Sequence, residues 1–363
     1  MTATDNETTA PSGTAATGTT PNDATPTETS DTRTSSTGTT AAAGAAPLSG
    51  PDLGVIVVLA GGLSHEREVS LRSGRRVAQA LRDRGCTVVE SDVNSDLITL
   101  LRDLDDPVVF PVVHGATGED GSLREVLGLL DVPFVGATGA DSRVAFDKSI
   151  ATSVIRGIGL TTPQQVALPD EVFRELGARA LMDALGERIG YPMFVKPSRS
   201  GSSLGCTKVA VPGELASAMV GAYAYGDVAV VETYIDGIEV AVTVIDRGNG
   251  PEALPAVEIR PDSGDYDYSS RYTAGSTRFI TPAEVPDDVA AACADMALRV
   301  HERLHLRDIS RTDMIIRDGV PHFLECNVAP GMTETSLVPL ELEAAGLDLG
   351  ELCEALVHQA RLR

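Results

Sequence analysis

The sequence predicts a protein of mixed α/β and α+β architecture. A doubly wound unit comes first, a small α+β unit follows, and an α+β unit with an antiparallel sheet comes last. The apolar run GVIVVLA at 54–60 is rich in β-branched residues, which is typical of a buried parallel strand, and a helical pattern follows at 68–84. Short strands flank a glycine-serine turn within 193–211, and alternating strands dominate after residue 237.

We expect four segments: a disordered tail at 1–50, the doubly wound domain at 51–140, the small central domain at 141–236, and the antiparallel domain at 237–363. The tail holds sixteen Thr among many Ala, Ser, Gly and Pro, and almost no large apolar side chain. Such a segment buries too little apolar surface to offset the entropy of ordering it. It also lacks the basic start and apolar run of a signal peptide.

The remaining pattern predicts the individual elements. Strands are expected at 87–90, 108–113, 133–135, 193–196, 207–211, 228–234, 238–246, 253–260, 311–317 and 321–327. Helices are expected at 142–156, 212–224 and 287–304 and at the C-terminus. The polar, tyrosine-rich stretch 261–277 has no regular period, which suits a mobile loop.

Composition excludes several classes of function. The 363 residues carry a formal net charge of −23, which argues against nucleic-acid or anionic-membrane partners. No apolar stretch approaches the roughly 18 to 20 residues that cross a bilayer. Five scattered cysteines without a CxxC pair fit a reduced, cytoplasmic chain. Only three residues are lysines, so any anionic substrate must be bound by a few well-placed cations.

A candidate phosphate-binding loop, PSRSGSSLG at 197–205, directly follows the strand that carries Lys196. Gly201 and Gly205 permit a tight turn, and the small residues between them leave backbone N–H groups free to face an anion. Lys196 could reach phosphate oxygens as a point charge. An exposed serine-glycine turn is the alternative that the motif alone leaves open.

A candidate metal site lies on two predicted strands joined around 318–319, with Asp313 on the first and Glu325 and Asn327 on the second. If the connection spans three residues, Asp313 lies across from Glu325, and Asn327 shares their face. A two-residue turn would slip the register and send the two carboxylates to opposite faces. The first register gathers three oxygen ligands, which suits Mg²⁺ held together with phosphates. A merely solvated face of charged residues is the alternative.

Three glycine-flanked loops appear where strands are predicted to end: 61–66 with Glu66, 114–121 with His114, and 330–336. Ligands bind beyond the carboxyl ends of strands in doubly wound sheets. Taken singly, His114 could be a structural hydrogen-bonding residue, and Glu66 could be an acid favoured by a helix N-terminus.

The ordered motifs GGLSHEREVSLRSG, HGATGEDG, FDKSIA, FVKPSRSGSSLG, YDYSSRY, SRTD and LECNVAPGMTETSLVP together resemble the D-alanine–D-alanine ligases of the ATP-grasp superfamily. The resemblance covers about residues 54–360. It implies that ATP activates the carboxylate of a first D-alanine as an acyl phosphate, which the amine of a second D-alanine attacks. The products implied are ADP, phosphate and the dipeptide used in peptidoglycan precursors, and a homodimer is possible.

The resemblance also implies a role for each matching residue. ATP would contact Lys148, Lys196, Gly201, Ser203, Glu232, Tyr234, Ile235, Glu239, Arg271, Ile315 and Leu324. Two Mg²⁺ ions, or Mn²⁺, would bind Asp313, Glu325 and Asn327. Catalysis would involve Glu66, Ser202, Tyr272, Arg311 and Gly331, and substrate binding would add His114, Ser336 and Leu337.

The sequence departs from the usual family pattern at a few positions. Arg271 stands where the family commonly has Lys, which keeps the charge but changes its geometry. Tyr272 favours an amine over a hydroxyl as the second nucleophile, by the same resemblance. Two rival hypotheses remain: a related ligase for other amino acids, and a nucleotide-binding module without catalysis.

Overall fold

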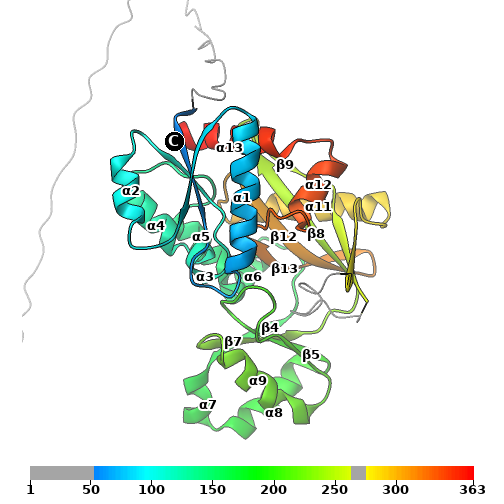
Figure 1. Cartoon of the computed structure of the whole chain (residues 1–363). Coiled ribbons are helices and arrows are strands. Elements are labelled where there is room, and N and C mark those ends of the chain that lie inside the picture. Colours follow the sequence, from blue (N-terminus) through cyan, green and yellow to red (C-terminus); the bar gives the residue numbers. More distant parts are fainter. Residues whose placement is uncertain (1–52, 263–274) are drawn as a thin grey trace, which may run out of the picture. The chain divides into compact units, whose positions relative to one another are not determined.

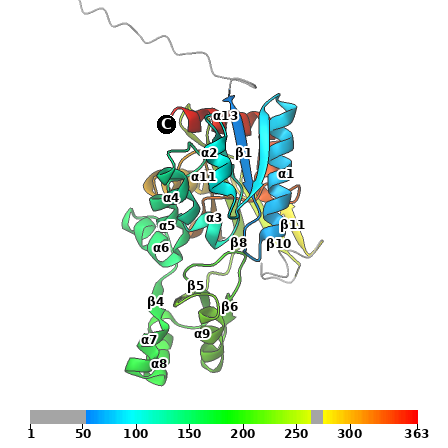
Figure 2. The same ribbon diagram turned by 60° about the vertical axis from the view of Figure 1, so that its left-hand side comes forward.

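The computed structural model describes residues 53–262 and 275–363 (Figure 1). Three parallel strands form its first sheet, with β1 between β2 and β3. Side chains of β1 alternate between two hydrophobic clusters, one shared with α1 and α13 and the other with α2 and α4, so helices cover both faces (Figure 2). The doubly wound prediction is therefore confirmed. The elements are β1 (Val55–Ala60), α1 (Arg67–Asp83), β2 (Thr87–Asp92), α2 (Leu97–Asp103), β3 (Val108–Pro111), α3 (Ala116–Glu119), α4 (Ser122–Leu129) and α13 (Leu349–Arg361).

Two predictions in this region are wrong. The expected strand at 133–135 is only an isolated bridge between Phe134 and Val109, because the chain turns away at Gly136, whose φ is +102°. The expected helix 142–156 is two helices, α5 (Gly139–Phe146) and α6 (Lys148–Gly157). Asp147 separates them: its backbone is extended, and its carboxylate accepts hydrogen bonds from the first N–H groups of α6.

The second sheet is antiparallel, in the order β4-β7-β5-β6, and its strands share a hydrophobic cluster with α8 and α9 (Figure 1). The loop predicted to bind phosphate joins β5 to β6. The elements are β4 (Gln165–Pro169), α7 (Asp170–Leu176), α8 (Ala178–Ile189), β5 (Met193–Pro197), β6 (Thr207–Val209), the short 3₁₀ helix η2 (Pro212–Glu214), α9 (Leu215–Tyr223) and β7 (Val228–Thr233).

The third sheet is also antiparallel, in the order β11-β10-β8-β12-β13, and β9 pairs with β8 beside this path. One face packs on α6 and α11, and the other face packs on α12. The expected strand 253–260 is divided into β9 and β10. The elements are β8 (Ile238–Asp246), β9 (Pro251–Ala253), β10 (Val257–Pro261), β11 (Thr277–Ile280), α11 (Asp287–Arg303), β12 (Ile309–Arg317), β13 (Val320–Asn327) and α12 (Leu337–Ala344).

The hairpin β12–β13 reaches the expected pairing by an unexpected route. Its turn has two residues, since Arg317 faces Val320, so the three-residue connection on which the expected pairing depended is not formed. The register then shifts after Met314, which pairs with Phe323, while Asp313 pairs with Glu325. Leu324 is the extra residue of this β-bulge. The bulge restores the register that the turn had shifted, and the two carboxylates lie opposite each other.

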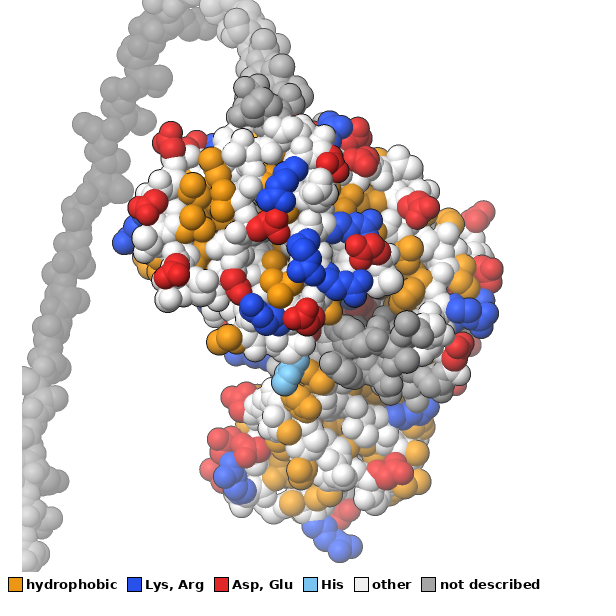
Figure 3. Space-filling view, in the orientation of Figure 1, with side chains coloured by type: hydrophobic (Ala, Val, Ile, Leu, Met, Phe, Trp, Pro, Cys, Tyr) orange, Lys and Arg blue, Asp and Glu red, His pale blue; other side chains and the backbone are white. Residues whose placement is uncertain are grey.

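The outer surface mixes both signs of charge. On the face shown in Figure 3, basic and acidic side chains are interspersed over the described residues. Partly exposed ion pairs of the described residues include Arg67–Asp92 (2.5 Å) and Arg82–Glu90 (2.7 Å). Within 53–262 and 275–363, no helix has the length and apolarity needed to cross a membrane.

A buried glutamate on α12, Glu341, forms hydrogen bonds with one edge of β8, at a position where no neighbouring strand pairs with that edge. The edge of β8 pairs with β10 through residue 241 and with β9 from residue 244 onward. In the gap between them, Thr243 donates its backbone N–H to Glu341 at 2.7 Å and its hydroxyl to the same carboxyl group. Glu341 is fully buried, and this burial raises its pKa to about 8.

Glu341 should therefore make stability depend on pH. Because the folded-state pKa lies above the ordinary value of 4.5, the folded protein binds this proton more tightly than the unfolded chain does. The contribution is complete below about pH 4.5 and is lost as the pH rises to about 8. Glu341→Gln keeps the shape without titrating. Urea unfolding from about pH 5 to about pH 8 should show a steeper loss in the wild type, by up to about 1.4 kcal/mol per pH unit. Parallel pH profiles for the two proteins would contradict this assignment.

Candidate active site

Two adjoining cavities lie where β12 and β13 approach the loop between β5 and β6. The first, of about 700 Å³, is lined by the three glycine-flanked loops, and we call it the loop cavity. The second, of about 780 Å³, is lined by β5, β7 and the start of β8, and we call it the sheet cavity. Residues that line both are Lys148, Ser200, Ser202, Ile259, Asp313 and Glu325. Every predicted site residue in the described part of the chain lines one cavity or the other, whereas Arg271 and Tyr272 lie outside the described residues.

The hairpin β12–β13 presents its polar face to both cavities. Arg311 donates two parallel hydrogen bonds to the carboxylate of Asp313, each 2.7 Å long. The Asn327 side-chain amide donates to Asp313 Oδ2 at 3.2 Å. The side chains of Arg311 and Asp313 are only 12% and 6% exposed. The guanidinium and any metal ion would compete for the same carboxylate oxygens.

The donor set fits a hard cation that is shared with a phosphate. Among residues 53–262 and 275–363, no group of three His, Cys, Asp or Glu side chains could hold a metal by itself. The hairpin offers the carboxylates of Asp313 and Glu325 and the amide oxygen of Asn327. Mg²⁺ is commonly bound by one or two carboxylates together with substrate phosphates. The residues present therefore suit Mg²⁺ better than zinc or copper.

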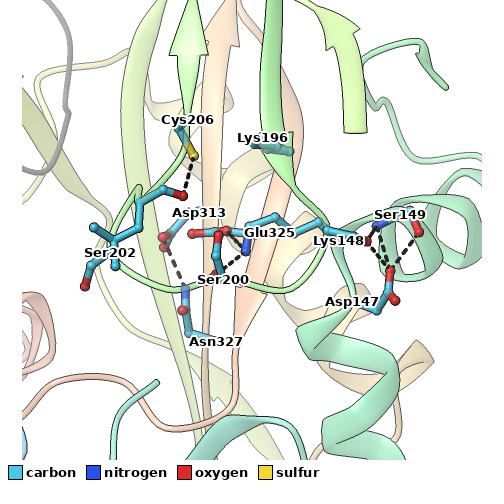
Figure 4. Close-up of polar contacts among 12 residues, drawn as sticks. Asp147, Lys148, Ser149, Lys196, Ser200, Ser202, Cys206, Asp313, Glu325 and Asn327 are labelled. Carbon is cyan, nitrogen blue, oxygen red and sulfur yellow. Dashed lines mark hydrogen bonds and ion pairs between the residues drawn. The ribbon is translucent and has the colours of Figure 1, made fainter. Parts of the chain in front are cut away.

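Lys148 links the hairpin to the loop between β5 and β6, with the sequence PSRSGSSLG at 197–205, which we call the glycine-serine loop (Figure 4). Its Nζ lies 3.1 Å from Glu325 Oε2 and donates to the backbone oxygen of Ser200 at 2.6 Å. Burial works to lower the pKa of Lys148, but the attraction of Glu325 and other nearby acidic groups outweighs it, so the pKa is raised. The side chain therefore stays a cation at the junction of the two cavities.

Lys196 forms a second buried ion pair. Its Nζ lies 2.7 Å from Glu232 Oε1, and the two side chains are 5% and 4% exposed. Neighbouring strands place them together, because β5 and β7 pair through Phe194 and Glu232. Both residues line the sheet cavity, so the polar atoms of this pair lie at its wall.

Apolar and aromatic side chains form the other walls of the sheet cavity. Phe194 and Tyr234 lie on one side, and Ile315 and Leu324 on the hairpin. The β-bulge lets Leu324 line this cavity together with its neighbour Glu325. Lys208 is exposed, yet its Nζ lies 3.9 Å from the centre of the Tyr234 ring and it lines the same cavity. All three lysines of the chain therefore line one cavity.

Glu66 lies between two loops that must approach it closely. The hydroxyl of Ser202 donates to its carboxylate. A Cβ atom at Gly115 would lie 2.5 Å from Glu66 Oε2, and one at Gly201 would lie 2.8 Å from Oε1. Glycine is therefore required at both positions if Glu66 is to keep this place.

His114 is held by protein groups on both ring nitrogens. Nδ1 lies 3.0 Å from the backbone oxygen of Ala329, and Nε2 lies 3.1 Å from the hydroxyl of Ser73. A carbonyl oxygen only accepts, so Nδ1 carries the proton and Nε2 accepts from Ser73. Burial lowers the pKa of His114 to about 4. The ring is thus a neutral link between the loop after β3 and the loop before α12, and it also lines the loop cavity.

The N-terminus of α12 opens into the loop cavity. Ser336 directly precedes the helix. Its hydroxyl accepts a hydrogen bond from the backbone N–H of Thr333 and forms another with the Thr333 hydroxyl, so it does not cap the helix. Leu337 is the first helical residue, and both residues line the cavity. Gly331 packs against Ser336, because a Cβ there would lie 2.7 Å from the Ser336 hydroxyl. Backbone N–H groups at such a helix end favour a carboxylate.

Two acidic residues among those that the sequence did not predict have notable contacts at the site. Glu119 on α3 lines the loop cavity and accepts a hydrogen bond from the backbone N–H of Gly115 at 2.8 Å. Burial, and then the charge of Glu66, raise its pKa to about 8. Asp147, between α5 and α6, contacts the loop that follows β5. Both lie within the motifs HGATGEDG and FDKSIA, and the capping preference of Asp is the one signal that could have singled out Asp147.

Two antiparallel sheets close a nucleotide-sized cavity from two sides. One sheet carries a buried lysine and a glycine-serine loop, and the other carries paired carboxylates. This is the arrangement of the ATP-grasp class. The chain is a member of that class. The family described as "D-ala D-ala ligase C-terminus" matches residues 154–358. The D-alanine–D-alanine ligase of Fervidobacterium nodosum is 36% identical over 312 residues, which cover 84% of this chain and 98% of the relative. The corresponding ligase of an Anaeromyxobacter species is 38% identical over 309 residues, with 85% and 97% covered. The chain therefore belongs to the D-alanine–D-alanine ligase family.

Solved structures agree with this assignment. The D-alanine–D-alanine ligase of Bacillus anthracis complexed with ATP has a TM-score of 0.72 and 28% identity, and 85% of this chain and 98% of that chain are covered. The VanG D-Ala:D-Ser ligase of Enterococcus faecalis has a TM-score of 0.74 and 26% identity, with 85% and 99% covered. The ATP-grasp fold expected from the sequence is thus confirmed.

Proposed function

We propose that this protein joins two D-alanine molecules at the expense of ATP, through an acyl phosphate, and releases ADP and phosphate. The observation that carries the proposal is the position of Lys148. Its Nζ contacts the glycine-serine loop and Glu325 where the sheet cavity meets the loop cavity. A phosphoryl group that passes between a nucleotide and a carboxylate needs a cation at such a junction.

ATP would occupy the sheet cavity. Ile315 and Leu324 would contact the base, with Glu232 and the backbone of Tyr234 and Ile235 at its edge. Glu239 would bind the ribose. Lys148 and Lys196 would contact the phosphates, and the backbone at Gly201 and Ser203 would cover them. The positive φ angles of Ser202 (53°) and Ser203 (56°) suit a loop whose N–H groups turn toward an anion.

Amino acids would occupy the loop cavity. Glu66 would bind the ammonium group of the first D-alanine, and Arg311 and the N–H of Gly331 would stabilise the negative charge that builds up at the attacked carbonyl. The second D-alanine would place its carboxylate at Ser336 and Leu337, where α12 begins. Closing the cavity would keep water from the acyl phosphate.

Asp313, Glu325 and Asn327 would hold two Mg²⁺ ions, for which Mn²⁺ could substitute. When bound, the metal ions would neutralise charge on the phosphates. Arg311 would then lose Asp313 as a partner and could turn toward the reacting groups in the loop cavity. We further propose that the dipeptide serves peptidoglycan precursor synthesis.

The direct test is to identify the product. The purified protein with ATP, Mg²⁺ and an equimolar mixture of D-amino acids should yield D-alanyl-D-alanine by mass spectrometry, with one phosphate released for each dipeptide. L-alanine serves as the matched control and should yield no dipeptide. ATP turnover with another amino acid but not with D-alanine would overturn the specificity and leave the ligase assignment standing.

A ligase that takes D-serine as its second substrate is the alternative that one observation favours. The VanG enzyme, named a D-Ala:D-Ser ligase, has a TM-score of 0.74 with this chain. Direct competition between D-alanine and D-serine distinguishes the two candidate functions. D-alanyl-D-serine would be the main product only if the second substrate is D-serine.

A further inference from the structure

Asp147 accepts more hydrogen bonds than a helix cap requires. Its Oδ1 accepts from the backbone N–H groups of Ser149 and Ile150, both at 3.2 Å, and these are the capping bonds of α6. The same oxygen also accepts from the hydroxyl of Ser198 at 2.6 Å. Its Oδ2 accepts from Arg199 Nε at 3.0 Å. Ser198 and Arg199 belong to the glycine-serine loop, so the carboxylate joins that loop to α6.

The neighbouring residue strengthens the same junction. The backbone N–H of Lys148 donates to the backbone oxygen of Ser198 at 2.9 Å. Its Nζ donates to the backbone oxygen of Ser200 at 2.6 Å (Figure 4). Ser198 is itself fixed to β7 by a backbone bond to Val228 at 2.9 Å. Three successive loop residues are therefore held by the start of α6, immediately before Gly201 and the two serines with positive φ.

We propose that Asp147 is a positioning residue, which fixes the first part of the glycine-serine loop against α6 and thereby sets the affinity of the sheet cavity for nucleotide phosphates. This inference rests on the proposed use of ATP. The two carboxylate oxygens have separate tasks: Oδ1 caps the helix and holds Ser198, whereas Oδ2 holds Arg199 alone. Burial would raise the pKa of Asp147, but the hydrogen bonds from Ser198, Ser149, Ile150 and Arg199 lower it, so the carboxylate is charged.

Substitutions can separate the loop contacts from helix capping. Asp147→Asn keeps an acceptor for the cap and for Ser198, but places an amide group opposite Arg199. Asp147→Ser keeps a capping hydroxyl, but its shorter side chain should reach neither Ser198 nor Arg199. Both substitutions keep a good N-cap residue, so helix capping is preserved. Asp348 is the matched control: it caps α13 by accepting from Glu351 N–H, and it lies in neither cavity. Asp348→Asn makes the same chemical change without touching the loop.

ADP binding in the presence of Mg²⁺, measured by calorimetry, is the first readout. Asp147→Asn should weaken it about fivefold to tenfold and Asp147→Ser further, because a hydrogen bond between charged groups is lost. The KM for ATP should rise in parallel, while the KM for D-alanine at saturating ATP changes less than about twofold. Asp348→Asn should leave all three unchanged. If both Asp147 variants bind ADP as the wild type does, the residue only caps α6 and the proposal is wrong.

A double-mutant cycle with Arg199→Met tests the pairing directly. The double variant Asp147→Asn/Arg199→Met should be no worse than the poorer single variant. Full additivity would overturn the proposal. Thermal unfolding without nucleotide shows whether each variant is folded. If Asp147→Ser is not folded, ADP binding by Asp147→Asn decides the test. ADP binding does not require ligation, so a wild type that binds ADP but makes no dipeptide would refute the proposed function alone.

Discussion

Asp313→Asn is expected to lower dipeptide formation by at least about a thousandfold, the largest effect of any single substitution in this protein. The change removes the charge of a proposed metal ligand and disturbs the two hydrogen bonds that Asp313 accepts from Arg311. Preorganised charges around a transferring phosphoryl group commonly contribute factors of about 10³ or more. Phosphate release, measured with saturating ATP, Mg²⁺ and D-alanine, is the assay.

The same hairpin offers a matched control. Asp318 lies in the β12–β13 turn, with a side chain 91% exposed and a φ of +52° that asparagine also tolerates. Asp318→Asn should keep full turnover and stability. Circular dichroism should show that both variants are folded. Turnover of Asp313→Asn within about twofold of the wild type would refute the metal assignment.

Lys196→Met is expected to have the second-largest effect, because it should reduce stability and nucleotide binding together. The substitution leaves Glu232 buried, only 4% exposed, without its partner at 2.7 Å. Breaking such a buried pair from one side costs about 3–5 kcal/mol of unfolding free energy. Loss of the cation should also weaken ATP binding at least about tenfold.

The double variant Lys196→Met/Glu232→Gln separates the two consequences. Removing both charges should recover most of the unfolding free energy, since no unpaired ion remains buried. ATP binding and turnover should stay low, because the proposed contact of Lys196 with the phosphates is still missing. Recovery of turnover together with stability would show that Lys196 serves the fold and has no role in the reaction.

The strands and helices that sequence patterns predict well are those with one strong signal. β1 is a continuous apolar run, and α1 has a regular apolar stripe that ends at a glycine. β4 and α7 carry no such signal, because β4 is at most partly buried along its length and α7 has no buried residue. These elements owe their conformation to neighbouring strands and helices, which periodicity does not encode.

The register of β12–β13 shows why correct pairing can rest on an incorrect premise. Asp318 and Gly319 both have positive φ, at 52° and 77°, as a two-residue hairpin turn requires. That turn alone would separate Asp313 from Glu325. The bulge at Leu324 compensates for it, and a bulge leaves no trace in the spacing of apolar residues.

The candidate site was predictable in its members but not in its contacts. The predicted site residues in the described part of the chain all line the two cavities, although other lining residues were not predicted, and the catalytic roles stay predictions. Sequence could not show that Lys196 pairs with Glu232, or that Arg311 occupies Asp313, because both contacts depend on strand pairing and side-chain direction. Asp147 was hidden for a related reason: a helix predicted to continue through residue 147 leaves no cap to notice.

The confinement of lysine to the sheet cavity has a practical consequence for chemical labelling. Arginines supply the cations of the surface ion pairs, and guanidinium groups do not react with ordinary acylating reagents at neutral pH. Lys148 and Lys196 are buried, and Lys208 lies at the rim of the same cavity. Every side-chain amine that such a reagent could modify therefore belongs to one cavity. Coupling a support or a dye to a lysine of this protein would therefore place it at that cavity.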